Sequence, residues 1–245
     1  MTASIDRHGE KKILMIVANP AVSPTTGWPV GFWWAELTHP WWAFTEAGYA
    51  IDIASPKGGD LEADGFSDPE DASGYSAADI LSLGFKTSPA HAALLQGTKA
   101  IDAVDPTAYD AIFVAGGQSP MVTMIDDAGL HAFVAKAYEA GRIVAAVCHG
   151  TCILLKTRLA NGELLVKGKT WTGFANSEEA YADAWVGRKI QPFWIEDEAR
   201  GMDGTNFVVG SMFKPFALRD GNLITGQQQY SGAAAAALVI EALGR

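Results

Sequence analysis

Short apolar runs separated by helix-like segments dominate the pattern of hydrophobic and polar positions along this chain. Residues 12–18, 110–115 and 142–147 are almost continuously apolar, and residues 49–54 alternate between apolar and polar positions. Continuous apolar runs of this length are typical of strands that are covered on both faces, and alternation is typical of a half-covered strand. The pattern therefore predicts four strands.

Helical patterns lie between these predicted strands. One runs to Gly48 and another covers residues 130–140, with Gly141 directly after it, and glycine is common just past a helix end. Strands that alternate with helices indicate an α/β fold, in which a parallel sheet carries helices on both faces. We expect one domain over residues 1–245, with residues 57–108 forming a small cap above the sheet because they lack a strong strand pattern.

Composition narrows the class of partner. The formal net charge of −10 argues against a nucleic-acid surface, which needs clustered lysine and arginine, so we expect a small-molecule partner. Residues 1–12 are polar, and the alanine-rich stretch 233–243 is too short to span a bilayer, so no membrane segment is expected. The two cysteines are four residues apart, which favours free thiols in a reducing, cytoplasmic compartment.

Cys148 is the strongest candidate for chemistry. It follows a predicted buried strand and has small residues two positions before and after it, Ala146 and Gly150, as a sharp strand-to-helix elbow requires. At the start of a helix, backbone N–H groups and the helix dipole favour a thiolate. Most cysteines are buried packing residues, and we interpret Cys152 in this way, although a resolving thiol stays an alternative. The adjacent His149 favours a functional reading of Cys148.

The positions of the histidines exclude two classes of cysteine enzyme. The five histidines are His8, His39, His91, His131 and His149. None follows the elbow, whereas papain-like enzymes and true class I glutamine amidotransferases take their histidine from later in the chain. The base must therefore be His149 or a residue before it. A zinc site is poorly supported because no second cluster of ligands has suitable spacing.

Several motifs occur together in a characteristic order. They are Glu36 with His39-Pro40, Gly48-Tyr49 leading to residues 55–59 with Asp64 and Ser67, Tyr109-Asp110, Gly116-Gly117, residues 145–150, residues 172–179 and residues 220–227. With them the chain resembles the ThiJ/PfpI superfamily over nearly its whole length. Within that superfamily it is similar to the glutathione-independent glyoxalases, also called glyoxalase III, and to related stress chaperones.

The resemblance implies a flavodoxin-like, class I glutamine amidotransferase-like sheet with a small inserted cap, and a homodimer. It also implies roles for individual residues: Cys148 as nucleophile, His149 as general acid or base, and Glu36 as a carboxylic acid beside the sulfur. Glu36 lies among tryptophans and Leu37, an awkward place for an unpaired charge, which favours a functional reading.

Two further features of the site follow from the resemblance. Glu179 falls where the histidine-orienting residue is expected, with Glu178 as the alternative because only register separates them. The backbone N–H groups of Gly117 and His149 would hold a developing oxyanion. Gln118 is expected beside the substrate, at a position where the family commonly has histidine.

The expected activity is the conversion of a small 2-oxoaldehyde such as methylglyoxal to a 2-hydroxy acid, with no cofactor and no metal. Besides Gln118, Thr151 and Gln228-Gln229 depart from the family pattern around the pocket. The elbow alone also fits an amidase acting on a small C–N substrate. A different class is a redox-responsive chaperone in which Cys148 is oxidised.

Overall fold

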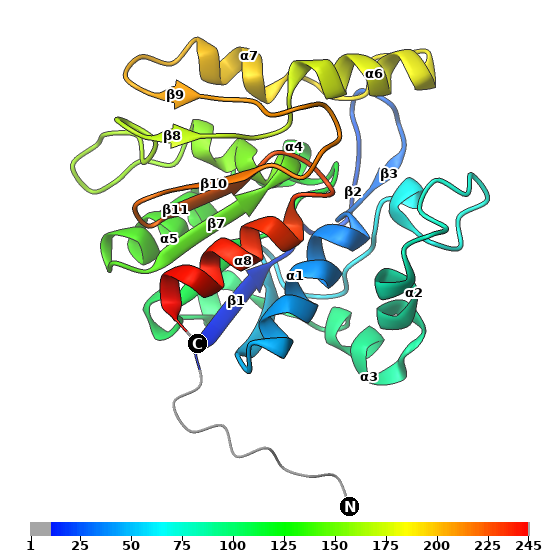
Figure 1. Cartoon of the computed structure of the whole chain (residues 1–245), viewed down its shortest axis with the longest axis horizontal. Helices are drawn as coiled ribbons and strands as arrows, with labels where there is room; N and C mark the ends of the chain where they lie inside the picture. Colours follow the sequence, from blue (N-terminus) through cyan, green and yellow to red (C-terminus); the bar gives the residue numbers. More distant parts are fainter. Residues whose placement is uncertain (1–10, 245) are drawn as a thin grey trace, which may run out of the picture.

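The computed structural model describes residues 11–244. Residues 1–10 of the polar N-terminal stretch named above therefore lie outside the described residues. A seven-stranded sheet runs through this part of the chain in the order β10-β11-β7-β6-β1-β4-β5 (Figure 1). Its strands are β1 (Lys12–Ile16), β4 (Ala50–Ser55), β5 (Lys99–Ala100), β6 (Ala111–Val114), β7 (Ile143–Val147), β10 (Ala217–Asp220) and β11 (Leu223–Gly226). All neighbouring pairs are parallel except β10 and β11.

Helices cover both faces of this sheet. In Figure 1, α1 (Trp34–Glu46) and α8 (Gly232–Leu243) lie side by side in front of the sheet, and the two helices contact each other. On the opposite face, α5 (Ala128–Glu139) packs against β6 and β7. The remaining α-helices are α2 (Ile80–Thr87), α3 (Pro89–Ala92), α4 (Pro120–Thr123), α6 (Asn176–Val186) and α7 (Ile195–Arg200). Two small sheets pair β2 (Ala21–Val22) with β3 (Pro29–Val30) and β8 (Thr170–Trp171) with β9 (Asn206–Phe207).

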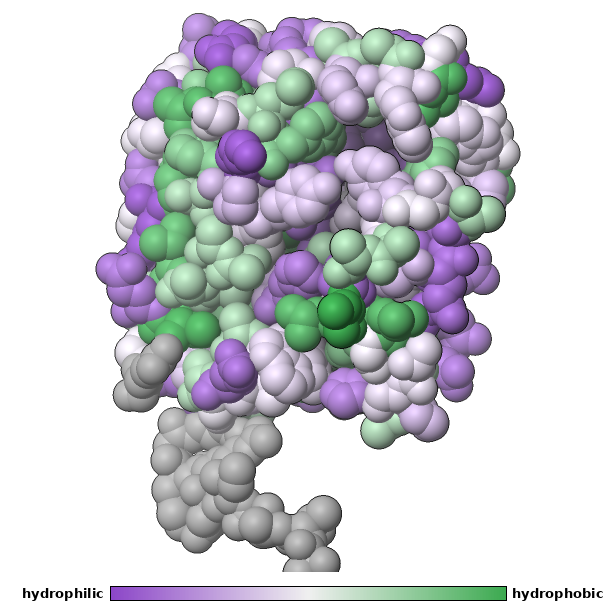
Figure 2. All heavy atoms as spheres, turned by 45° about the vertical axis from the view of Figure 1, so that its right-hand side comes forward, coloured by the Kyte–Doolittle hydropathy of each residue, from purple (hydrophilic) through white to green (hydrophobic). Residues whose placement is uncertain are grey.

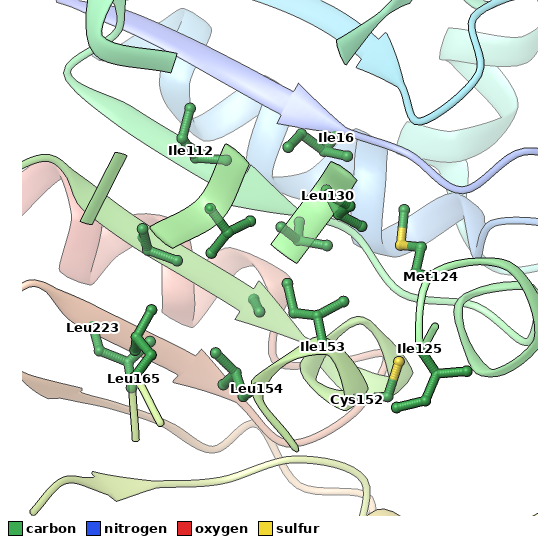
Figure 3. Close-up of a cluster of buried hydrophobic side chains, with 14 of the residues drawn as sticks. Ile16, Ile112, Met124, Ile125, Leu130, Cys152, Ile153, Leu154, Leu165 and Leu223 are labelled. Carbon is green, nitrogen blue, oxygen red and sulfur yellow. The ribbon is translucent and has the colours of Figure 1, made fainter. Parts of the chain in front are cut away.

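The two-sided covering explains why β1, β6 and β7 lack polar alternation. In β1, Ile13 and Met15 belong to the core beneath α1 and α8, whereas Leu14 and Ile16 belong to the core on the α5 side. Figure 3 shows the second core, in which Ile16 and Ile112 lie with residues of the segment after β7. Each face of the central strands therefore buries apolar area, which contributes about 25 cal/mol per Å² to folding.

The predicted α/β class with a mostly parallel sheet is confirmed, and the four predicted strands correspond to β1, β4, β6 and β7. The helical patterns before Gly48 and over residues 130–140 correspond to α1 and α5. Residues 57–108 hold short helices, among them α2 and α3, and the two-residue edge strand β5. Across residues 11–244, no helix is long and apolar enough to cross a membrane.

Candidate active site

A sharp turn places Cys148 at the carboxyl end of β7. Cys148 has a φ of 55°, a left-handed conformation that non-glycine residues adopt only when their surroundings impose it. A Cβ added at Gly150 would lie 2.8 Å from the carbonyl oxygen of Ala115, so glycine is required there. The expected elbow is therefore present. The helix that begins there, Cys148–Leu155, is a 3₁₀ helix.

His149 links the elbow to a buried carboxylate. Its Nδ1 lies 3.4 Å from Cys148 Sγ, and its Nε2 lies 3.0 Å from Glu179 Oε1. The imidazole stacks on Phe174 with ring centroids 4.2 Å apart, which fixes the plane of the ring. Sulfur, imidazole and carboxylate thus form one buried chain of hydrogen-bonding groups.

Glu178 and Glu179 point to different partners although they are neighbours in the first turn of α6. Glu178 accepts hydrogen bonds from the backbone N–H of Phe213 at 2.8 Å and from Nε2 of Gln227 at 2.9 Å. It therefore anchors the segment that carries Phe213. Of the two acids, only Glu179 reaches His149.

Glu36 lies beside the sulfur, fully buried in the first turn of α1. Its Oε2 accepts the backbone N–H of Gly116 at 2.8 Å. Burial raises the pKa of Glu36 to about 8, and hydrogen bonds from Cys148 and Gly116 offset part of that rise. At neutral pH this carboxyl group therefore holds a proton that it can exchange with its neighbours.

Burial and the adjacent Glu36 carboxyl raise the pKa of the Cys148 thiol well above its ordinary value, and the backbone N–H of His149 opposes this only in part. This direction is opposite to the one expected for a thiolate at the start of a helix. A short 3₁₀ segment supplies little dipole, and Cys148 is only 2% exposed. The nearest acceptor for the thiol proton is His149 Nδ1, 3.4 Å from the sulfur.

Gly117 presents a free donor next to the elbow. Its φ of 114° and the 2.6 Å distance between an added Cβ and the carbonyl oxygen of Gly31 both require glycine. Within residues 11–244 its backbone N–H has no hydrogen-bond acceptor. The neighbouring Gln118 also lines the pocket, and its Oε1 is buried with no partner in the same part of the chain. Both groups are available to a bound molecule.

Asp64 is a residue that sequence reasoning left without a role. It is completely buried, and its carboxylate accepts the backbone N–H of Gly31 at 2.9 Å and that of Gln118 at 2.6 Å. These two bonds join the loop before α1 to the loop that carries Gly117. Burial raises the pKa of Asp64 to about 7, while the two N–H donors and His149 lower it in part. The only sequence signal was its place within a motif.

A cleft opens above the sulfur, and the space inside it and at its open mouth is about 720 Å³. Cys148, His149, Glu179, Gly117 and Gln118 all contribute to its wall. The other lining residues are mostly aromatic: Trp28, Trp33, Phe66, Tyr75, Phe174, Tyr181, Trp185 and Phe213. Phe66 and Tyr75 come from the 57–108 segment, so that segment forms part of the cleft wall. Figure 2 shows the molecule with this side brought forward, and its surface is hollowed there.

The second cysteine lies outside the cleft. Cys152 packs beside Ile125 in the core on the α5 side of the sheet (Figure 3). Its Sγ lies 3.4 Å from the carbonyl oxygen of Pro120, and burial raises its pKa. Among the described residues, no group of three or more histidine, cysteine, aspartate or glutamate side chains is arranged to hold a metal ion.

The fold and the site together define a class: α/β proteins that carry a cysteine on an elbow at the carboxyl edge of a parallel sheet. Within that class, the DJ-1/PfpI family model matches residues 30–242, and the chain belongs to this family.

The chain is also similar to individual members of known sequence or crystal structure. The chain is 28% identical over 236 residues to the probable glutathione-independent glyoxalase hsp3103 of Schizosaccharomyces pombe, which covers 87% of this chain and 90% of that protein. Its fold is similar to the crystal structure of glyoxalase III from Candida albicans, with a TM-score of 0.75, 25% identity and coverage of 95% and 97%. It is also similar to the Rapid Encystment Protein 24 kDa of Francisella tularensis, with a TM-score of 0.84, 26% identity and coverage of 96% and 100%.

Proposed function

We propose that this protein is a cysteine-dependent, glutathione-independent glyoxalase that converts 2-oxoaldehydes to 2-hydroxy acids. The observation that carries the proposal is the position of the Cys148 thiol between two groups that can exchange protons. His149 lies on one side with its carboxylate partner, and the protonated Glu36 lies on the other. The descriptions of the relatives from S. pombe and C. albicans support the same activity.

The first step is addition of sulfur to the aldehyde carbon. A new C–S bond forms as the thiol proton passes to His149, and the aldehyde oxygen takes up the electron pair of the broken π bond and then the proton of Glu36. In this proposal the backbone N–H groups of Gly117 and His149 hold this oxygen before it is protonated. The product of the step is a hemithioacetal on Cys148.

The next steps are an internal redox exchange followed by hydrolysis. Glu36, now a carboxylate, removes the hydrogen of the former aldehyde carbon as a proton, and the electron pair moves to the adjacent ketone, whose oxygen takes a proton from His149 to form an enediol. Reprotonation at the ketone carbon gives a thioester of the 2-hydroxy acid. Water then cleaves the C–S bond, releasing the acid and restoring the thiol. One carbon is oxidised and its neighbour is reduced, so the sequence consumes only water.

A product assay tests the proposal. The purified protein is incubated with methylglyoxal in the absence of glutathione, and NMR follows substrate and products. Stoichiometric formation of lactate is the expected result. A parallel incubation with small amides measures released ammonia. Ammonia release without any lactate would overturn the proposal in favour of C–N bond hydrolysis. The absence of both lactate and ammonia would overturn it as well.

A further inference from the structure

We propose that the cleft selects 2-oxoaldehydes that carry an aromatic group on the ketone carbon, so that an aryl glyoxal is a better substrate than methylglyoxal. This inference rests on the proposed function, and it concerns the part of the cleft that a methyl group would leave empty. For phenylglyoxal the overall reaction adds one water and yields mandelate. The aldehyde carbon is oxidised to the acid and the ketone carbon is reduced to the alcohol.

The upper wall of the cleft is a collar of aromatic rings. Trp185 of α6 contacts Phe66 and Tyr75, with ring centroids 5.3 Å and 5.8 Å away. Tyr75 in turn contacts Trp33 at 5.9 Å, and Phe66 contacts Trp28 at 6.2 Å. Most of these pairs are edge-on, a favourable arrangement of aromatic rings. The collar is therefore formed before any substrate arrives.

Several collar rings remain accessible to solvent. Trp185 is 55% exposed and Tyr75 is 41% exposed, although each packs against aromatic neighbours. Tyr181, which also lines the cleft, is 53% exposed and packs edge-on against Phe213 at 5.4 Å. A ligand with an apolar ring would cover these faces and remove their apolar area from water.

The described charged side chains that line the cleft include no lysine or arginine, which indicates that the substrate is neutral. Among the described residues that line the cleft, Glu179 is the only acid. Arg188 lies near the mouth, but its guanidinium stacks over the Trp28 ring at 5.8 Å and donates to the Thr25 carbonyl. The lining thus offers no cation to pair with a carboxylate or phosphate, whereas apolar rings are abundant.

Depth sets the orientation of the substrate. Cys148 is only 2% exposed at the inner end, so the aldehyde carbon must enter first. The group on the ketone carbon then points outwards, towards Trp185 and Tyr181. A methyl group at this position would be too small to contact the collar, whereas a phenyl ring would lie between its rings.

The first experiment compares kcat/KM for phenylglyoxal and methylglyoxal. Partial burial of a phenyl ring in place of a methyl group is expected to favour phenylglyoxal by about tenfold or more. Equal values, or a preference for methylglyoxal, would overturn the inference while leaving the proposed function in place.

A pair of tryptophan variants locates the preference. Trp185→Ala is expected to lower the phenylglyoxal to methylglyoxal ratio of kcat/KM about fivefold, because only the aryl substrate reaches the collar. Trp42→Ala is the control, since Trp42 is similarly exposed at 44% but does not line the cleft. A ratio that stays unchanged in Trp185→Ala, or that falls equally in both variants, would contradict the inference.

A binding measurement separates this inference from the proposed chemistry. Quenching of tryptophan fluorescence in Cys148→Ser reports the affinity for 2-hydroxyacetophenone and for hydroxyacetone, neutral analogues that cannot react. Tighter binding of the aryl analogue supports aromatic selection even if wild-type protein turns over neither aldehyde, an outcome that would refute only the glyoxalase proposal. Equal affinities would refute the aromatic selection itself.

Discussion

At the scale of single residues, the hydrogen bonds of His149 determine which of its two ring nitrogens carries the hydrogen. The carboxylate of Glu179 can only accept a hydrogen bond, so the hydrogen of the neutral imidazole lies on Nε2. Nδ1 is then left as an acceptor 3.4 Å from Cys148 Sγ, where it can take the thiol proton. Burial raises the pKa of Glu179, and the charge and hydrogen bond of His149 lower it in part. We therefore propose that Glu179 positions His149.

Removing the charge of Glu179 tests this assignment. In Glu179→Gln the amide can donate to Nε2, which would place the imidazole hydrogen on the wrong nitrogen, and kcat is expected to fall about 10²-fold. The pH profile of kcat should also shift, which loss of packing alone would not cause. Glu178→Gln keeps an oxygen for Phe213 and Gln227 and is expected to lose much less. Equal losses in both variants would contradict the role of Glu179.

Single residues also show where sequence reasoning stops. The motif around Glu179 narrowed the histidine's partner to two adjacent acids, and the register of α6 then selects between them. Asp64 had no comparable signal, because its partners are backbone N–H groups 33 and 54 residues away in the chain. Such contacts depend on how loops meet in space, which periodicity and composition do not encode.

At the scale of elements, the elbow is the feature on which the site depends. The turn at Cys148 is held by close approach of β7 to the loop after β6, where an added Cβ at Gly116 would lie 2.9 Å from that of Cys148. Gly150 meets the carbonyl oxygen of Ala115 on the other side. The strained φ of Cys148 persists because its surroundings leave no other conformation.

Two glycine-to-alanine variants with opposite expected effects test this packing. Gly150→Ala forces a methyl group against the backbone, and the free energy of unfolding is expected to fall by about 1–3 kcal/mol, with a matching loss of activity. Gly84→Ala lies in α2 with open space around it, and it is expected to add about 0.5–1 kcal/mol. Chemical denaturation measures both. A neutral Gly150→Ala would show that the elbow is not tightly held.

The predicted elements agree best with the observed ones where the sequence pattern has a single physical cause. Burial on both faces makes β1, β6 and β7 apolar throughout, so these strands were predicted within a few residues of their observed bounds. The β10–β11 hairpin at the sheet edge was not predicted as such, because its four-residue strands carry a weaker pattern. The elbow pattern around Cys148 predicts a helix after it, and that helix is a 3₁₀ helix, a type the pattern does not specify.

For the molecule as a whole, the buried acids link stability to pH. Glu36 and Asp64 have pKa values raised by burial to about 8 and about 7, against ordinary values of 4.5 and 3.8. Between pH 4 and pH 8 the folded state therefore binds more protons than the unfolded state. The free energy of unfolding must then decrease as pH rises through this window.

Thermal unfolding between pH 5.5 and pH 8.5 tests whether the free energy of unfolding decreases as pH rises. The melting temperature is expected to fall as pH rises, with a loss of a few kcal/mol because each pKa unit corresponds to about 1.4 kcal/mol. The dependence should be weaker in Glu36→Gln, which removes one of the two titrating groups. It should be unchanged in Asp71→Asn, whose carboxylate accepts local hydrogen bonds such as that from the backbone N–H of Ser73. A melting temperature that rises over this range would show that the two acids are ionised in the folded protein.

The most direct test of the central claim compares the two cysteines. Cys148→Ala should lower turnover of 2-oxoaldehydes at least about 10³-fold, because no other group on the cleft wall can form the thioester. Cys152→Ala, which alters a buried thiol four residues away in the core, should keep most of the activity. Full turnover by Cys148→Ala would contradict the account.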